Sequence, residues 1–93
     1  SVMKMHHKLK QCIISEKRCI RVDYLVTEER PSEFCFEVIL YHPDGSEERE
    51  EIHNMVMSSD DALEFLHLLA RSQVTPTTFW DILHDMQLVR SLG

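Results

Sequence analysis

Two helix-start signals divide the C-terminal third of this chain and constrain its fold more than any other feature. In the first, Ser58-Ser59-Asp60-Asp61, a serine hydroxyl can accept a hydrogen bond from a free backbone amide, and the aspartates oppose the positive end of the helix dipole. In the second, Val74-Thr75-Pro76-Thr77, Thr75 can cap a helix and Pro76 suits the first helical position, where a missing amide hydrogen costs nothing. We therefore predict one helix that ends near Gln73 and a second that begins at Pro76.

Both predicted helices carry apolar residues at helical spacing. The residues that share one face are Ala62, Phe65, Leu66 and Leu69 in the first helix, widened by Leu63, Leu68 and Ala70, and Phe79, Ile82, Leu83 and Met86 in the second. The broad stripe of the first helix predicts that it contacts both a sheet and the second helix.

Two earlier segments, residues 18–29 and 34–42, alternate with the period of two that is typical of strands. The predicted core faces are Ile20, Val22, Tyr24 and Val26 in one strand, and Phe34, Phe36, Val38 and Leu40 in the other. The sequence His42-Pro43-Asp44-Gly45 favours a tight turn into a third strand over residues 46–57, of which only the far half is expected to be deeply buried. Cys12-Ile13-Ile14, followed by a tight turn at residues 15–17, predicts a further short strand.

This order of elements predicts an α+β fold: an antiparallel sheet of three to four strands, centred on a β-hairpin and packed on one face by a C-terminal αα-hairpin. The 93 residues, 43% of them apolar, suit one core. Residues 1–10 are basic without a period, so we expect a flexible basic arm there and a single domain over residues 11–93. Ser1-Val2 resembles the remnant of an expression tag, with translation starting at Met3 or Met5.

The cysteines and the apolar runs together predict a cytoplasmic protein. No apolar run approaches the roughly 18 residues that span a bilayer, and residues 1–10 lack the apolar centre of a signal peptide. Cys12, Cys19 and Cys35 lack the Cys-x-x-Cys spacing of a zinc or redox site. We expect three buried free thiols in a reducing compartment.

The charge distribution argues against nucleic acid as a partner. The net charge of −6 divides into +3 for residues 1–30 and −9 for residues 31–93, which include both predicted helices. The outward positions of the second helix are Thr77, Asp81, His84, Asp85 and Gln87, with no cation before Arg90. DNA-reading helices need such cations because phosphate contacts dominate affinity. The alternative is a nucleic-acid binder that uses the N-terminal arm, through Lys4, Lys8, Lys10, Lys17, Arg18 and Arg21.

Residues that could support metal binding or catalysis are few. His67 of the first helix could meet His84 and Asp85 of the second, but no histidine pair has the i, i+4 spacing of a zinc enzyme. Gly45 and Gly93 are the only glycines, so no glycine-rich phosphate loop can form. We therefore expect no cofactor and favour a non-enzymatic role. A small metal-dependent or hydrolytic enzyme that uses His67, His84 and Asp85 is the alternative.

Surface residues offer several candidates for protein recognition. Trp80 lies one position off the apolar stripe, so it is either a flank of the core or an exposed anchor. The acidic run over residues 47–51 either protects an edge strand from unwanted pairing or binds a basic partner. On the second sheet face, Leu25, Cys35, Ile39 and Tyr41 would form an apolar patch unless something covers it. The predicted interaction residues are Trp80, Tyr41, Ile39, Glu47, Glu48, Glu50 and Glu51.

A family pattern runs from the third strand into the second helix. Its segments are Ile52-His53-Asn54-Met55-Val56, Ser58-Ser59-Asp60, Leu66 to Leu69, Val74-Thr75-Pro76 and Asp81-Ile82-Leu83-His84-Asp85. Over residues 19–87 the chain resembles a family of short uncharacterised proteins from clostridial Firmicutes, classed as a domain of unknown function. The resemblance implies a bacterial cytoplasmic origin and strands followed by two helices, and it supplies no catalytic residue. We predict a protein–protein interaction or regulatory module that binds another protein or a second copy of itself.

Overall fold

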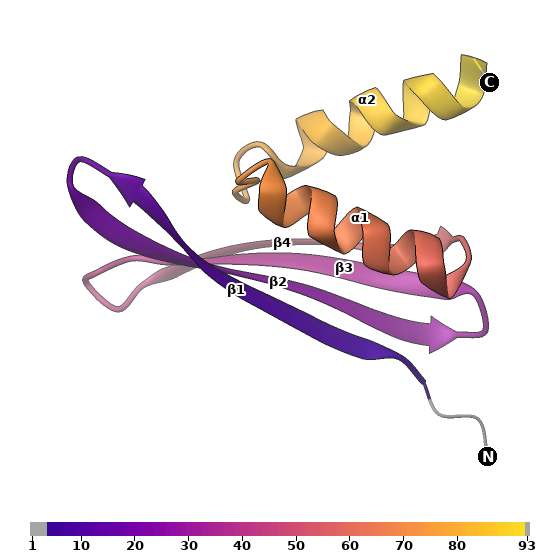
Figure 1. The fold of residues 1–93 in the computed structure, drawn as a ribbon, viewed down its shortest axis with the longest axis horizontal. Coiled ribbons are helices and arrows are strands. Elements are labelled where there is room, and N and C mark those ends of the chain that lie inside the picture. Colours follow the sequence, from indigo (N-terminus) through magenta and orange to yellow (C-terminus); the bar gives the residue numbers. More distant parts are fainter. Residues whose placement is uncertain (1–3, 93) are drawn as a thin grey trace.

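The computed structural model describes residues 4–92, with side chains up to Asp85, and has the predicted α+β architecture. The elements in chain order are β1 (His6–Ser15), β2 (Arg18–Arg30), β3 (Glu33–Tyr41), β4 (Glu47–Val56), α1 (Ser59–Arg71) and α2 (Phe79–Leu92). The four strands form one antiparallel sheet in the order β1-β2-β3-β4 (Figure 1). Each strand pairs with the next because a short turn connects them.

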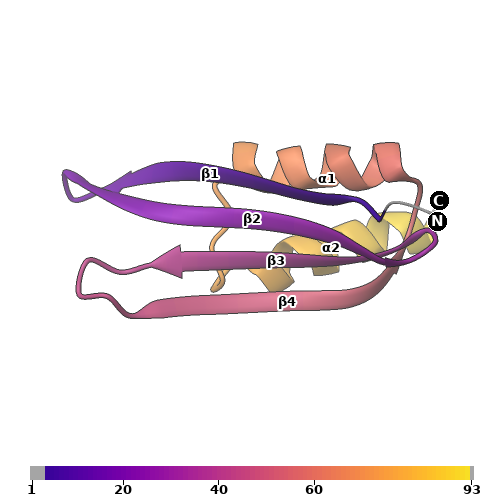
Figure 2. The same cartoon turned by 90° about the horizontal axis from the view of Figure 1, so that it is seen from below.

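Both helices lie on the same side of the sheet, and we call the opposite side the outer face (Figures 1 and 2). In Figure 2, which views the outer face, α1 lies behind the β1 side of the sheet and α2 lies behind β3. Figure 1 shows that α2 rises away from the sheet after the loop that follows α1. Within residues 4–92, no helix covers the outer face.

The core lies between the sheet and the helices. Its buried side chains are Val22, Tyr24, Val26, Phe34, Phe36 and Val38 from the sheet, and Met57, Ala62, Phe65, Leu66, Leu69, Val74, Phe79 and Leu83 from the helical side. Phe36 and Phe65 meet edge to face, with ring centroids 4.8 Å apart. These positions confirm the predicted core faces of β2, β3 and α1, except that Ile20 and Leu40 are only half-buried. The predicted core position Met86 lies outside the side chains described.

Strand β4 is less buried than the sequence suggested. Ile52 and Met55 are only partly buried, and Val56 is 65% exposed. Met57, the last residue of the predicted strand segment, is buried in the core, so deep burial is limited to the end of the far half. Strand β4 itself is at the edge of the sheet, with a neighbour on one side only.

Strand β1 replaces most of the predicted flexible arm. It pairs with β2 along its full length, from His6 opposite Thr27 to Ser15 opposite Arg18. Within β1, Leu9 and Ile13 pack against the core, and between them Gln11 Nε2 donates a 2.8 Å hydrogen bond to the Ala70 carbonyl. The arm was therefore a wrong prediction from residue 6 onward, and the short strand at Cys12-Ile13-Ile14 is part of a ten-residue one. Residues 1–3 lie outside the described part of the chain.

The turns differ in how well their residues suit them. The β3–β4 turn is as predicted: the Gly45 amide donates a 3.0 Å hydrogen bond to the His42 carbonyl, and Gly45 has a φ of 95°. The β1–β2 turn consists of Glu16 and Lys17, with φ values of 50° and 65°. Two left-handed central residues define a type I′ hairpin, which asparagine and glycine favour and these longer side chains do not.

The first helix-start signal is confirmed and the second is displaced. The Ser58 hydroxyl accepts a 3.1 Å hydrogen bond from the Asp61 amide, so Ser58 caps α1. Helix α1 ends at Arg71, two residues before the predicted Gln73.

Helix α2 begins at Phe79, whereas the sequence predicted a start at Pro76. The cause is a separate turn over residues 75–78. In this turn the Thr78 amide donates to the Thr75 carbonyl at 3.1 Å, and the Thr75 amide donates to the Thr78 hydroxyl at 3.0 Å. Pro76 lies buried within it.

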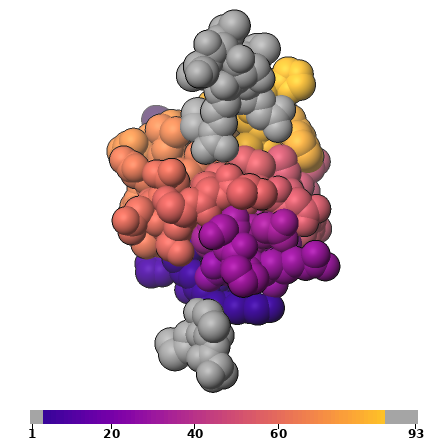
Figure 3. Space-filling model, turned by 90° about the vertical axis from the view of Figure 1, so that its right-hand side faces the viewer, coloured from indigo at the N-terminus to yellow at the C-terminus, as the bar shows by residue number. Residues whose placement is uncertain are grey.

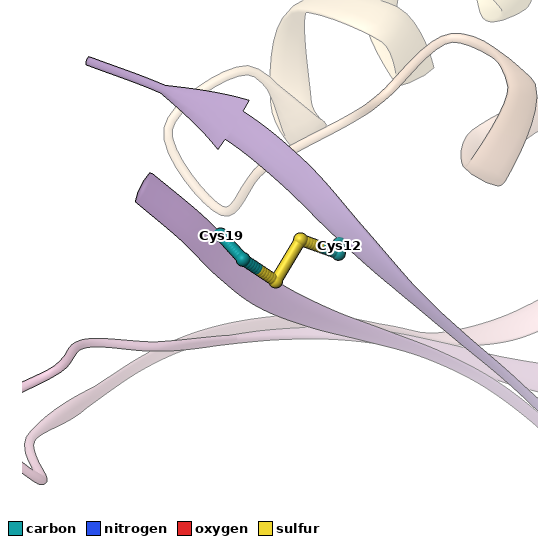
Figure 4. The surroundings of a disulfide bond; sticks show 2 residues. All are labelled: Cys12 and Cys19. Atoms are coloured by element: carbon teal, nitrogen blue, oxygen red, sulfur yellow. A yellow bond between two sulfur atoms is a disulfide. The ribbon is translucent and has the colours of Figure 1, made fainter. Parts of the chain in front are cut away.

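The cysteines also correct the prediction of three buried free thiols. Cys12 and Cys19 are exposed and form a disulfide between β1 and β2, with Cα atoms 5.3 Å apart (Figure 4). In the β1–β2 register Cys12 lies opposite Arg21 and Cys19 lies opposite Ile14, so the two cysteines are diagonal neighbours, at a Cα separation that a disulfide can span. Cys35 is a free, half-buried thiol on β3.

Candidate functional site

The centre of the outer face holds a fully buried carboxylate, Asp23 of β2. Arg21 donates two hydrogen bonds of 3.0 Å to it, Lys8 Nζ lies 3.3 Å from Oδ2, and the Tyr41 hydroxyl donates at 3.3 Å. Burial alone would raise the pKa of Asp23, but the hydrogen bonds and positive charges of Arg21 and Lys8 lower it overall. Asp23 is therefore ionised at neutral pH and organises its neighbours.

This network closes the apolar patch that the sequence suggested for the outer face. Ile39 lies opposite Asp23 on β2 and Arg49 on β4 and is only 5% exposed. The Arg21 guanidinium lies 4.9 Å from the centroid of the Tyr41 ring. Ile39 and Tyr41, both predicted interaction residues, thus present little free apolar surface to a partner.

A second group of polar side chains, which we call the Cys35 cluster, consists of Glu29 from β2, Cys35 from β3 and His53 from β4. His53 Nδ1 lies 2.9 Å from Glu29 Oε1, and Cys35 Sγ lies 3.9 Å from His53 Nε2. Glu51 Oε1 approaches the same Nε2 atom at 3.2 Å. One potential ligand atom from each member lies within 4.8 Å of the other two.

Irregularities in the sheet bring the Cys35 cluster together. The register of β3 with β4 shifts at Cys35, so that His53 and Asn54 both lie opposite it, and Asn54 has a φ of 60°. The register of β2 with β3 shifts at Glu29. Such β-bulges redirect side chains and are frequent beside functional sites. Figure 3 views this end of the molecule, where the purple β2–β3 turn lies between indigo β1 and the start of α1.

The electrostatics of the Cys35 cluster argue against a nucleophilic cysteine. Burial, together with the charges of Glu29, Glu51 and Glu37, raises the pKa of Cys35 to about 11. The thiol is then protonated at neutral pH, whereas a nucleophilic cysteine must be a thiolate. Hydrogen bonds that the His53 imidazole donates to Glu29 and Glu51 stabilise its protonated form and raise the pKa of His53. The cluster combines sulfur, nitrogen and oxygen donors at the rim of a hollow of about 460 Å³ that Glu29, Arg30, His53 and Asn54 line.

The acidic run of β4 divides between the two faces of the sheet. On the outer face, Arg49 lies between Glu47 and Glu51 and forms ion pairs with Glu47 at 2.8 Å and Glu37 at 2.9 Å. On the helix side, Glu48 lies 2.6 Å from His42 Nε2.

Trp80 contacts the helix-side part of this run. Its indole Nε1 donates a 2.9 Å hydrogen bond to Glu50, and its ring meets Phe79 edge to face with centroids 5.7 Å apart. Trp80 nevertheless remains 47% exposed. A hollow of about 330 Å³ lies between residues 48–50 of β4 and the Pro76-Thr77 segment. We call Trp80, this hollow and the acidic residues of β4 the β4 edge surface.

The structure does not bring together the metal ligands that the sequence suggested. His67 is exposed on α1, and His84 and Asp85 are exposed on α2. Among the side chains described, from Lys4 to Asp85, the Cys35 cluster is the group of three that could hold a metal ion.

The basic residues proposed for nucleic-acid binding are partly neutralised. Lys8 and Arg21 pair with Asp23, and Lys4 Nζ donates a 2.8 Å hydrogen bond to the Glu29 carbonyl. The other three, Lys10, Lys17 and Arg18, are exposed on β1, β2 and the turn between them.

Sequence reasoning missed the Cys35 cluster, although half of it could have been found. The β3–β4 turn was predicted correctly, and counting outward from Tyr41 opposite Glu47 places Cys35 opposite His53. The position of Glu29 could not be predicted in this way, because the register between β2 and β3 shifts at Glu29.

Comparison with known proteins shows which family the chain belongs to. A family model described as "Family of unknown function (DUF6514)" matches residues 3–89. This match confirms the resemblance to a domain of unknown function and extends it toward the N-terminus, while the clostridial origin stays a prediction. No curated protein and no solved structure matches the chain significantly. Within residues 4–92, no helix has the length and apolar character needed to cross a membrane.

Proposed function

Because the chain belongs to DUF6514, a family of unknown function, we propose its role from the geometry: a non-enzymatic protein-interaction module that binds a basic, extended segment of another protein along the β4 edge surface. The observation that carries this proposal is the exposed indole of Trp80, hydrogen-bonded to Glu50 of an acidic edge strand. If the protein regulates its partner, we expect it to do so by binding through this same β4 edge surface.

The edge position of β4 supplies the first argument. Strands β1 and β4 end the sheet, so each has backbone amides and carbonyls on one side that no neighbouring strand pairs. An extended segment can add to such an edge through main-chain hydrogen bonds. Strand β1 carries the lysines and the disulfide, whereas β4 carries the acidic run, so the two edges select different partners.

Charge complementarity supplies the second argument. Residues 47–51 contain four glutamates and one arginine, and Arg49 is already paired with Glu37 and Glu47. The hollow is lined by Glu48, Arg49 and Glu50. The bond of Glu50 is to the neutral indole of Trp80, and the partner of Glu48 is His42, so these carboxylates can attract a lysine or arginine side chain of the partner. The same charge discourages pairing of β4 with a second copy of itself, because like charges would face each other. A homodimer, if formed, should use another surface.

The third argument is the position of Trp80. Tryptophan is enriched at interface hot spots because a large ring loses little side-chain entropy on binding. Here the bond to Glu50 and the contact with Phe79 fix the ring before any partner arrives. A cation from the partner can stack on the exposed part of the indole.

The test uses Trp80 as its own reporter, since it is the single tryptophan of the chain. A short synthetic peptide that alternates lysine with threonine should change Trp80 fluorescence saturably, and added salt should weaken the effect. A glutamate–threonine peptide is the matched control. Glu48→Gln and Glu50→Gln should weaken binding, whereas Glu64→Gln on α1 removes the same charge elsewhere and should not. Equal responses to both peptides would show the proposal to be wrong.

Two finer predictions join this proposal. We infer that α1 and α2 pack as an αα-hairpin on the sheet, which is supported by Leu66, Leu69, Phe79 and Leu83 sharing one buried cluster. We also keep a cytoplasmic location. The Cys12–Cys19 disulfide is unusual for that compartment, where thiols are kept reduced. Thiol labelling of protein taken from its own cell is the test: labelled Cys12 and Cys19 would support the cytoplasm, and an intact disulfide would contradict it.

A further inference from the structure

We propose that the Cys35 cluster is a binding site for a zinc-like divalent cation, with Cys35 Sγ, one imidazole nitrogen of His53 and a carboxylate oxygen of Glu29 as ligands. None of the three ligands belongs to the β4 edge surface, although Glu51 of that surface lies beside His53. His53 follows the acidic run, on the outer face where β2, β3 and β4 carry their irregularities.

The distances within the cluster suit one shared cation. Zinc binds sulfur at about 2.3 Å and nitrogen or oxygen at about 2.0–2.2 Å, so tetrahedral ligand atoms lie roughly 3.3–3.8 Å apart. His53 makes its two contacts through different ring nitrogens: Nδ1 lies 2.9 Å from Glu29 Oε1, and Nε2 lies 3.9 Å from Cys35 Sγ. One potential ligand atom from each of the three residues lies within 4.8 Å of the other two, so a shared cation requires side-chain rotations that bring one His53 nitrogen, the sulfur and the oxygen to tetrahedral spacing.

The backbone holds the ligands on rigid elements, as a metal site requires. Each ligand comes from a different strand of one sheet, and the β-bulges at Glu29 and at His53-Asn54 lie on both sides of Cys35. Asn54 adopts a left-handed conformation with a φ of 60°, which asparagine tolerates better than most residues do. This geometry aims side chains from β2 and β4 at the thiol of the strand between them.

The donor set selects the class of metal. Thiolate and imidazole ligands favour zinc and related transition metals, whereas calcium and magnesium need oxygen ligands. Each ring nitrogen of His53 already has a carboxylate beside it, Glu29 at Nδ1 and Glu51 at Nε2. If Nδ1 binds the cation, Nε2 keeps Glu51 as a hydrogen-bonding partner that fixes the ring, and the fourth position is open to water. If Nε2 binds the cation, Glu51 is close enough to be the fourth ligand.

Positively charged side chains near the Cys35 cluster oppose the binding of a cation, but they do not cancel the negative charge of the carboxylates around it. Arg30 lines the same hollow, and the Lys4 ammonium donates to the Glu29 carbonyl. Three carboxylates, those of Glu29, Glu37 and Glu51, act on Cys35. When the thiol becomes a ligand it releases its proton to solvent, so binding of the divalent cation leaves a metal–thiolate bond and one free proton.

The experiment titrates the full chain, without a histidine tag, first with Co²⁺ and then with Zn²⁺. We expect one equivalent of Co²⁺ to give a near-ultraviolet thiolate-to-cobalt charge-transfer band, and Zn²⁺ to displace the cobalt and abolish the band. Because Cys12 and Cys19 are joined in a disulfide, Cys35 is the thiol that can produce this band. This readout needs no variant, so it holds even if a substituted chain fails to fold.

Variants then assign the ligands. Loss of a residue that only orients a metal ligand typically weakens metal binding by about 10–100-fold. Cys35→Ser and His53→Gln remove ligands themselves, so each should weaken Zn²⁺ binding by at least about that factor. His67→Gln, a matched surface histidine, should leave affinity unchanged. The proposal is overturned if Co²⁺ gives no thiolate band, if Cys35→Ser binds Zn²⁺ as tightly as the unsubstituted chain, or if only the His6→Gln, His7→Gln double variant loses binding.

Discussion

Tyr24 connects the sheet to the segment between the helices, and its hydroxyl gives the sharpest test of what holds the helical layer in place. Tyr24 is fully buried, and its hydroxyl donates a 2.7 Å hydrogen bond to the Val74 carbonyl. Gln11 Nε2 donates to the same hydroxyl at 3.1 Å and to the Ala70 carbonyl at 2.8 Å. One small network therefore ties β1 and β2 to the end of α1 and to the loop that follows it.

Tyr24→Phe removes only the hydroxyl oxygen, so the apolar packing of the ring is kept. The variant loses the bond to Val74 and leaves that buried carbonyl without its partner, a loss that costs about 1–3 kcal/mol. A domain of this size has about 5–10 kcal/mol of stability in total. Each kcal/mol lowers Tm by roughly 4–8 °C in a domain of 60–100 residues, so the shift should be easily measured.

Urea unfolding followed by far-ultraviolet circular dichroism and by Trp80 fluorescence measures the change in the free energy of unfolding. Tyr41→Phe is the matched control: its hydroxyl makes a longer 3.3 Å bond to Asp23, which keeps Arg21 and Lys8 as partners, so the loss should cost less. Gln11→Ala alone and combined with Tyr24→Phe completes a double-mutant cycle, in which the two losses should not be additive. A loss below about 0.5 kcal/mol for Tyr24→Phe, or an equal loss for Tyr41→Phe, would refute the reasoning.

Three further predictions test other parts of the structure. Glu16→Asn combined with Lys17→Gly should raise the free energy of unfolding in urea by about 1 kcal/mol, because both positions are left-handed, and an unchanged value would contradict the strain argument. Because the pKa of folded Asp23 is below its ordinary value, its contribution to stability is present above about pH 4 and is lost as pH falls through the folded pKa. Melting curves of Asp23→Asn should therefore lose less stability than the unsubstituted chain between about pH 4 and pH 2, and equal acid slopes would count against this. Reduction of Cys12–Cys19, seven residues apart, should cost at most about 2.5 kcal/mol, because the loop is short and the strands already hold it; complete unfolding by a thiol reductant would disprove this.

The local parts of the fold could be predicted from the sequence because each depends on neighbouring residues. The alternation in β2 and β3 identified the buried faces, since side chains of a strand point to opposite sides in turn. The Ser58 cap and the Gly45 turn followed from hydrogen bonds that span three residues. These features need no knowledge of what lies across the sheet.

The start of α2 shows where local reasoning stops. Thr75 and Pro76 do form a hydrogen-bonded turn, as their side chains favour, but the helix begins three residues later because Thr78 closes that turn first. Two local signals compete here, and the sequence does not rank them.

Strand β1 and the outer face needed the tertiary structure. Residues 6–10 look like a polar arm because one side of the strand carries lysines, and only pairing with β2 shows that Lys8 neutralises Asp23. A buried carboxylate is stable only when partners from other strands surround it, so a single strand gives no sign of Asp23.

By itself the sequence determined the order of the elements, the faces that form the core, the first helix cap and the β3–β4 turn, all through contacts between near neighbours. The tertiary structure alone decided the full extent of β1, the Cys12–Cys19 bond, the Trp80–Glu50 contact and the Cys35 cluster. The physical reason is distance along the chain: Glu29 meets His53 across 24 residues, and Glu50 meets Trp80 across 30. Such pairs form only when register, bulges and helix placement are fixed together.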